Sequence, residues 1–232
     1  MSKYEYVSKN EYRPVREELE EIIKKTQKIL RNKKTGITFQ FELIGSGSKH
    51  LITRIIGGNK GFDFDYNIVI NYDDGQMWKA DYARKEFTKA LDEAIKGTQY
   101  DHPQNSKVAI TIKVKDTKKS KVLHSCDFAI VYYPDEIEEG HMYAKLDPQT
   151  NKCVWEMRKY TKNYHKKLNW LKDNIDGYWD VIKDEYRKLK NNNKDPNKHS
   201  FQLFYETINN VYNNCSYWKK LGLLPSLFFY FE

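Results

Sequence analysis

Hydrophobic positions in the first 133 residues follow a helical spacing at first and a strand-like spacing afterwards. Between residues 14 and 30 they recur every three or four residues, which predicts an amphipathic helix that begins at Pro14. Beyond this helix, apolar and polar residues alternate in short runs that are typical of strands. The predicted strands are residues 37–43, 62–70, 108–114 and 121–133, and a second helix is predicted over residues 78–95.

From Cys153 onward the pattern is that of helices, which are predicted over residues 154–171, 178–189 and from about 196 to 212. Strands and helices in front of a purely helical segment indicate an α+β fold. We therefore predict a domain of strands and helices over residues 1–150. A helical domain is predicted to follow over residues 151–232.

Composition narrows the class of protein. Aromatic residues make up 15% of the 232 residues, which excludes a disordered chain. No run approaches the roughly 18 apolar residues that a spanning helix needs, and the first residues do not resemble a signal peptide. Three cysteines without a C-x-x-C spacing argue against a disulfide framework and against a structural zinc site. We expect a soluble, cytoplasmic protein with no membrane partner.

The net charge is +8, and the basic excess is concentrated in two segments. Residues 107–121 hold six lysines and one acid, and residues 151–200 hold 13 Lys and Arg and seven acids. Such segments indicate either an ordinary solvated surface or a surface that faces a polyanion. The charge alone does not separate these alternatives.

Three aspartates stand in predicted strands and are candidates for chemistry. Asp63 and Asp65 are two residues apart, so their side chains project from the same side of a strand. Two such carboxylates repel each other unless a cation lies between them, and carboxylates that bridge two Mg²⁺ ions are used in phosphoryl and nucleotidyl transfer. Asp127 stands in an otherwise apolar strand, where an acid is costly unless it is paired or metal-bound. Each aspartate taken alone is also compatible with a solvated strand face.

The order of these motifs resembles the DNA polymerase β-like nucleotidyltransferase superfamily. The resemblance rests on Leu43-Ile-Gly-Ser-Gly-Ser48, on Gly61-Phe-Asp-Phe-Asp-Tyr66 and on Ser125-Cys-Asp-Phe-Ala129, and it covers roughly residues 37–133. It leans towards the template-independent branch of oligoadenylate synthetases, bacterial cyclic-dinucleotide synthases and poly(A)- or CCA-adding enzymes.

The resemblance implies a nucleotidyltransferase-type mixed sheet flanked by helices over residues 1–150, with the helical domain of residues 151–232 completing the nucleotide cleft. It also implies a set of site residues. Asp63, Asp65 and Asp127 are expected to be catalytic and to bind Mg²⁺, or Mn²⁺ in its place. The turn of Gly45, Ser46 and Ser48 is expected to contact phosphate, with Ser46 as the first candidate and Ser48 as the second. That order is left open, because the gap between Ser46 and Asp63 is longer than is usual in the family. In the helical part, Lys190 and Ser200 stand where the family places triphosphate contacts.

The implied activity is transfer of a nucleoside monophosphate from an NTP, with ATP expected, to an acceptor hydroxyl. RNA or a nucleotide is the favoured acceptor, and a small molecule or a protein stays open. The rival hypothesis is a non-catalytic module that binds nucleic acid or nucleotide through its basic, aromatic-rich surface. The acidic trio separates the two, because a groove that only binds phosphate has no use for three carboxylates. His124 is expected to face away from Asp127 and to be packed in the core.

Overall fold

The computed structural model describes residues 3–71, 77–134, 140–160, 164–195 and 197–220. The chain divides into two compact units, of which one is Glu5–Tyr160 and the other is made of Met1–Tyr4 and Thr161–Glu232. The pattern of the sequence predicted a division near residue 150. None of the helices within the described ranges is both long enough and apolar enough to cross a membrane.

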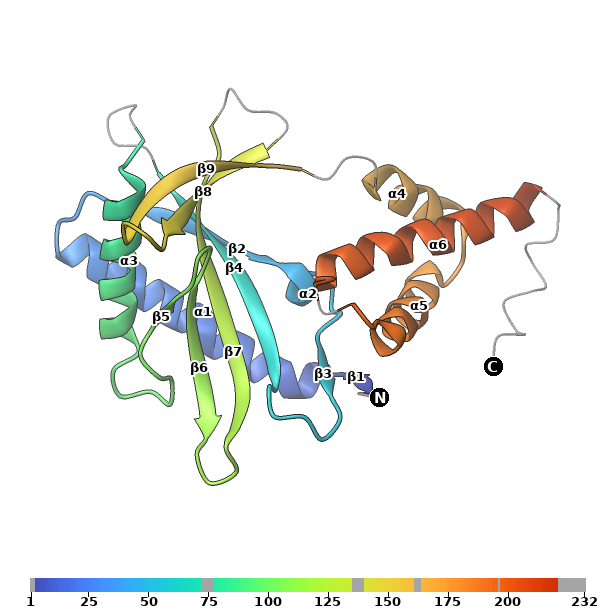
Figure 1. The fold of residues 1–232 in the computed structure, drawn as a ribbon, viewed down its shortest axis with the longest axis horizontal. Coiled ribbons are helices and arrows are strands. Elements are labelled where there is room, and N and C mark those ends of the chain that lie inside the picture. The colour runs from blue at the N-terminus through green and yellow to red at the C-terminus, as the bar shows by residue number, and fades with distance from the viewer. Residues whose placement is uncertain (1–2, 72–76, 135–139, 161–163, 196, 221–232) are drawn as a thin grey trace. The chain divides into compact units, whose positions relative to one another are not determined.

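The first unit is built from a large mixed sheet, a small two-stranded sheet and helices (Figure 1). The strands are β1 (Tyr4–Tyr6), β2 (Phe39–Ile44), β3 (Thr53–Ile55), β4 (Phe62–Ile70), β5 (Gln104–Asn105), β6 (Ile110–Asp116), β7 (Lys121–Tyr132), β8 (Gly140–Asp147) and β9 (Lys152–Lys159). The helices of this unit are α1 (Lys9–Asn32), α2 (Gly45–Ser48) and α3 (Ala80–Ala94).

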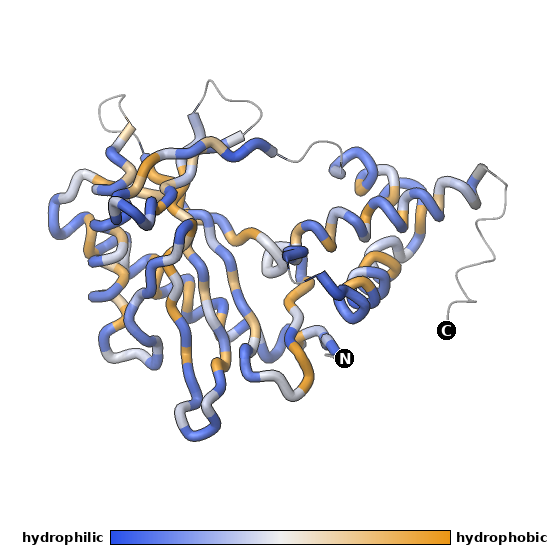
Figure 2. The backbone as a smooth tube through the Cα atoms, in the orientation of Figure 1, coloured by the Kyte–Doolittle hydropathy of each residue, from blue (hydrophilic) through white to orange (hydrophobic). Residues whose placement is uncertain are grey.

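The large sheet has the strand order β2-β4-β7-β6-β5, and β8 and β9 extend it from the end of β7. Strands β4 and β7 run parallel at its centre, and every other pair of neighbours is antiparallel. Figure 2 shows hydrophobic and hydrophilic positions alternating along these strands. One face of the sheet is therefore apolar and the other is polar.

Helices α1 and α3 supply the apolar layer for the buried face. Their inward side chains and those of the central strands form one hydrophobic core. Its fully buried members include Leu19, Ile23, Phe64, Phe87, Leu91 and Phe128. Since both helices lie on this face, residues that alternate with the core positions along β4 and β7 are left on the opposite, open face.

The second unit is helical, as the sequence predicted. It contains α4 (Tyr164–Asn174), α5 (Tyr178–Asn192) and α6 (Ser200–Lys220), and α6 packs against both of the other helices. Leu171, Ile182 and Phe204 are among its buried residues. Tyr4, the first residue of β1, is counted with this unit and not with the rest of its strand, and its backbone N–H donates to Asn191 Oδ1 at 2.6 Å. The predicted start of the third helix at Pro196 lies outside the described residues.

Three predicted element boundaries are clearly wrong, one of them the end of the last helix, which runs to Lys220 and not to residue 212. The first helix begins at Lys9 and not at Pro14, because its buried stripe already includes Tyr12. The helix predicted over residues 154–171 is wrong at its start, because residues 154–159 belong to β9. This strand pairs with β8 from Lys152 to Lys159, and that pairing is not visible in the local spacing of its side chains.

Candidate active site

The three predicted aspartates come together on the open face of the sheet. Asp65 on β4 is the register partner of Asp127 on β7, and Asp63 is the partner of Ser125. Side chains of register partners project from the same face of a sheet, on strands that lie about 4.8 Å apart. Phe64 between the two acids of β4 is fully buried against the helices. Asp63, Asp65 and Asp127 therefore share the face that the helices do not cover.

The electrostatics of Asp65 reflect this arrangement. Burial, which is the largest cause, and the charges of Asp63 and Asp127 together raise the pKa of the Asp65 carboxyl to about 7, while the charge of Lys49 opposes them. Ionising such a group at neutral pH costs free energy, and a cation beside it would remove that cost by stabilising the negative charge. The three carboxylates are thus a set of oxygen donors in need of positive charge.

The turn that the sequence predicted at residues 45–48 is the short helix α2, which follows β2 directly. Gly45 has φ +63, and a Cβ at this position would lie 2.5 Å from Asp65 Oδ2. Glycine is therefore required there on two grounds, the backbone conformation and the close approach to the carboxylate. The Ser48 hydroxyl donates to the Gly45 carbonyl at 3.1 Å, so this side chain is engaged within its own turn, and Ser46 is half-buried.

Two residues that the sequence analysis did not single out belong to this site. The Lys49 ammonium donates to the Gly45 carbonyl at 3.3 Å, and burial lowers the pKa of Lys49 although the charge of Asp65 raises it. The Thr111 hydroxyl, on β6 opposite Asp127, donates to Asp127 Oδ1. The signal for Lys49 was its position directly after the Gly-Ser turn. Thr111 had no signal, because only the pairing of β6 with β7 brings it to Asp127.

The long gap between Ser46 and Asp63 is occupied by structure. It contains β3, which pairs with β1, and then a glycine-rich turn that contacts the start of β7. Val122 N donates to the Asn59 carbonyl at 2.9 Å. A Cβ at Gly61 would fall on the Leu123 carbonyl, closer than real Cβ contacts come. The extra segment thus ties the beginning of β4 to β7.

Lys190 and Ser200 belong to the second unit. Lys190 lies near the end of α5, with its ammonium 4.9 Å from the ring centroid of Tyr4 and 5.3 Å from that of Tyr186. Ser200 is the first residue of α6 and is exposed. Their contact with a triphosphate stays a prediction. His124, by contrast, is buried on the core face, with Nε2 3.0 Å from the Tyr100 hydroxyl, as its spacing from Asp127 predicted.

The carboxylates of Asp63, Asp65 and Asp127 are the type of ligand that binds a divalent cation. Magnesium and manganese prefer carboxylate oxygens, and the raised pKa of Asp65 marks a place where positive charge is favoured. In the side-chain positions of the described residues, no group of three or more His, Cys, Asp or Glu converges as a ready metal-ligand set. The donor type and charge therefore fit, and convergence on an ion would require the carboxylates to turn.

No protein-family model and no curated protein sequence matches this chain. Solved structures do match. The STING-associated CdnE c-di-GMP synthase from Capnocytophaga granulosa has a TM-score of 0.55 and 17% identity, over 94% of this chain and 67% of that one. The Vibrio cholerae DncV cyclic AMP-GMP synthase, in complex with the linear intermediate 5′ pppA(3′,5′)pG, has a TM-score of 0.51 and 15% identity, over 76% of this chain and 45% of that one.

The apo form of the Vibrio cholerae synthase has a TM-score of 0.52 and 14% identity, over 89% of this chain and 53% of that one. The present chain thus spans about half the length of the Vibrio cholerae synthase. At these identities the likeness establishes the fold. The predicted fold class is confirmed: the chain has the nucleotidyltransferase-type fold that these bacterial cyclic-dinucleotide synthases share.

Proposed function

We propose that this chain is a metal-dependent nucleotidyltransferase, which moves a nucleoside monophosphate from an NTP to an acceptor hydroxyl and releases pyrophosphate. The observation that carries the proposal is the placement of Asp63, Asp65 and Asp127 on one open sheet face beside the Gly45 turn. A surface that only attracts phosphate would repel its ligand with three carboxylates. The non-catalytic basic module is therefore the less well supported alternative.

Asp63, Asp65 and Asp127 would hold Mg²⁺, or Mn²⁺ in its place. A bound ion supplies positive charge at the α-phosphate and at the leaving pyrophosphate. The protein supplies the frame for that chemistry. Gly45 leaves room for Asp65 to stay close to the turn, and the Thr111 hydroxyl fixes one oxygen of the Asp127 carboxylate.

Asp127 is the group that orients the acceptor hydroxyl and takes up its proton. The acceptor oxygen forms a bond to the α-phosphorus, the bond between that phosphorus and the bridging oxygen of the β-phosphate breaks, and pyrophosphate leaves with the electron pair. The turn of Gly45 and Ser46 is proposed to contact the phosphates, with Ser48 as the second candidate. Lys190 and Ser200 are proposed to contact the triphosphate from the helical unit.

A second nucleotide is the proposed acceptor. Its support is the likeness of the fold to synthases whose substrates and products are nucleotides and dinucleotides. ATP is the proposed donor, and RNA is the alternative acceptor. With a nucleotide as the acceptor, the product would be a linear or cyclic dinucleotide.

The test is label transfer with the purified chain. Each α-labelled NTP is incubated with Mg²⁺ or Mn²⁺, singly, in pairs and with RNA, and products and pyrophosphate are followed. The Asp63→Asn/Asp65→Asn double variant runs beside Asp180→Asn, a matched control whose side chain is 82% exposed on α5. We expect transfer by the wild type and by the control, and none by the double variant.

Transfer that persists in the double variant would overturn the assignment of the acids. Binding of RNA with no transfer of any nucleotide, under either metal, would favour the non-catalytic module. A labelled product that survives phosphatase and runs as a dinucleotide would identify the acceptor as a nucleotide, and label on RNA would identify the alternative.

A further inference from the structure

A second group of polar and aromatic side chains lies on the same open face of the sheet as the acids. Asn67 follows Asp65 by two residues on β4, so it projects from the same face about 6–7 Å farther along the strand. Its register partner on β2 is Glu42. Tyr133 follows the last residue of β7 and reaches both of them. This group therefore begins two residues beyond Asp65 along β4, next to the three aspartates.

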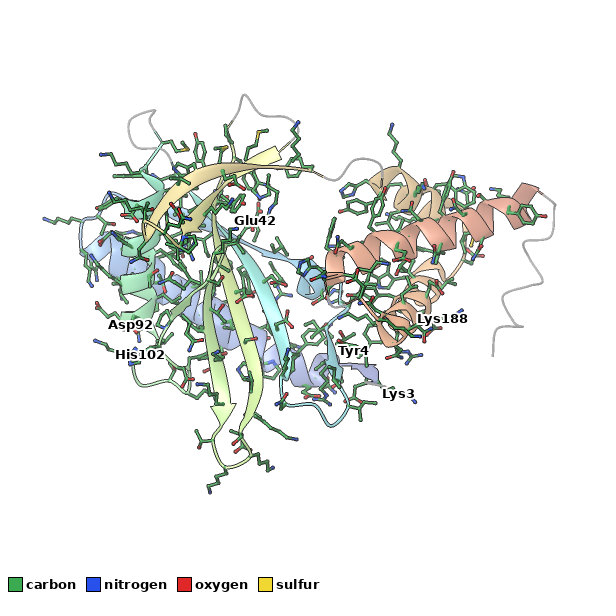
Figure 3. All side chains as sticks on the ribbon, in the orientation of Figure 1. Lys3, Tyr4, Glu42, Asp92, His102 and Lys188 are labelled. Carbon is green, nitrogen blue, oxygen red and sulfur yellow. The ribbon has the colours of Figure 1, made fainter. Side chains whose placement is uncertain are left out.

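Hydrogen bonds fix the orientation of Glu42. Asn67 Nδ2 donates to the Tyr133 hydroxyl at 3.1 Å, and this hydroxyl donates to Glu42 Oε2 at 2.8 Å. The Glu42 side chain is exposed, and Figure 3 labels it on β2. Oε1 of the same carboxylate has no hydrogen-bond partner among the described residues. The result is an accessible carboxylate that is held in place from one side.

Three aromatic rings, those of Tyr133, His141 and Tyr160, lie next to one another beside this carboxylate. The His141 ring on β8 lies 5.6 Å from the Tyr133 ring at an interplanar angle of 72°, and 5.6 Å from the Tyr160 ring at 37°. Tyr160 is 47% exposed. His141 Nδ1 is buried and has no hydrogen-bond partner within the described part of the chain. A buried polar atom without a partner is rare in folded proteins, because leaving it unpaired costs free energy, and a ligand that pairs with it would remove that cost.

These features fit a planar ligand with hydrogen-bond donors along one edge. Exposed aromatic rings stack on nucleobases without regard to base identity, so the choice of base falls to the edge contacts. The Watson–Crick edge of guanine carries two adjacent donors, N1–H and the N2 amino group, which match the acceptor oxygens of a carboxylate. Adenine presents N1 as an acceptor at the same place, and two acceptors facing each other are unfavourable.

We propose that Glu42, Tyr133, His141 and Tyr160 form a subsite for a guanine base, stacked on Tyr160 and read by Glu42. This inference rests on the proposed function, since the subsite serves a nucleotide whose phosphates or sugar lie at the aspartates. It concerns one of the two nucleotides in the reaction and leaves ATP as the partner nucleotide. The residues belong to one compact unit, Glu5–Tyr160.

The test compares nucleotides and variants by calorimetry with Mg²⁺. The probes are the α,β-methylene analogues of GTP, ITP and ATP, which bind without transfer. Inosine lacks only the N2 amino group of guanosine, so the wild type alone reports on that contact. We expect the GTP analogue to bind about tenfold more tightly than the ITP analogue. Glu42→Gln should lower the affinity for the GTP analogue about tenfold and change the affinity for the ATP analogue less than twofold.

Tyr160→Leu should weaken all three analogues about tenfold, because stacking does not depend on the base. The matched controls are Glu21→Gln and Tyr217→Leu, whose side chains are exposed elsewhere, and both should bind like the wild type. Equal binding of the GTP and ITP analogues, with Glu42→Gln unchanged, would overturn the guanine subsite. Label transfer that continues in that case would leave the proposed function standing. No binding of any analogue, together with no label transfer, would overturn both.

Discussion

The two faces of the β4–β7 strand pair place ionisable groups in opposite situations. On the helix-covered face, His124 is buried between Phe62 and Tyr100 and has a hydrogen-bond partner. On the open face, Asp65 lies beside two further carboxylates. The ionisable groups of the two faces therefore differ in their effect. A neutral, paired group stabilises a core, whereas like charges held together create a demand for a cation.

The pKa shifts of the two faces also have opposite consequences. Burial lowers the pKa of His124, so the histidine is neutral in the folded protein. Burial and neighbouring acids raise the pKa of Asp65 to about 7. Stability from His124 is therefore lost as the pH falls below about 6.5, and stability from protonated Asp65 is lost as the pH rises from about 4 towards 7.

The largest expected effect is on stability and comes from a substitution at Gly61, which would disturb the pairing of β4 with β7 and so both faces of the sheet. Gly61→Ala puts a Cβ onto the Leu123 carbonyl at a φ of +61, where backbone and not a flexible side chain must move. We expect a loss of about 3–5 kcal/mol in the free energy of unfolding, measured in urea. Gly57→Ala is the matched control, because its φ is +69 and its Cβ meets nothing within 4 Å. Equal losses in the two variants would show that backbone strain alone matters and that the contact with β7 does not.

The next effect is confined to the open face. Gly45→Ala places a Cβ 2.5 Å from Asp65 Oδ2, which is the end of a side chain that can turn away. We expect a folded protein whose kcat for transfer falls about a hundredfold, because the carboxylate leaves its position. Gly97→Ala, at φ +81 in open space, should keep full activity. Wild-type kcat in the Gly45 variant would mean that the turn does not position Asp65.

The smallest effect concerns the core face. His124→Phe keeps an aromatic ring beside Phe62 and leaves the Tyr100 hydroxyl without its partner, so we expect a loss of about 1–3 kcal/mol at pH 8. The unfolded variant can no longer bind a proton at this position. The free energy of unfolding of the variant should therefore fall less than that of the wild type between pH 8 and pH 5. Urea unfolding across that range measures both effects. An unchanged pH slope would show that His124 is not held neutral.

The sequence predicted the parts of the molecule that depend on local spacing. Period-two alternation from Phe62 to Ile70 predicted a strand with Asp63 and Asp65 on one side, and the structure has that strand as β4. The spacing of three between His124 and Asp127 likewise predicted opposite faces. These patterns work because each residue's side is set by its own strand.

Features that depend on strand pairing were not predictable in this way. β9 was mistaken for the start of a helix because its partner β8 lies outside any local pattern. Thr111 reaches Asp127, and Tyr133 reaches Glu42, only through the order of strands in the sheet. Pairing over such distances in sequence is decided by the packed fold, which periodicity does not report.

One measurement tests the central claim most directly: thermal unfolding and label transfer on the same preparation of Asp65→Asn at pH 8. If the open face holds charge for catalysis at a cost in stability, removing the Asp65 charge should raise Tm, by about 2–4 °C for each kcal/mol recovered. Transfer should fall at least about a hundredfold in the same sample. A lower Tm, or transfer at the wild-type rate, would contradict the account.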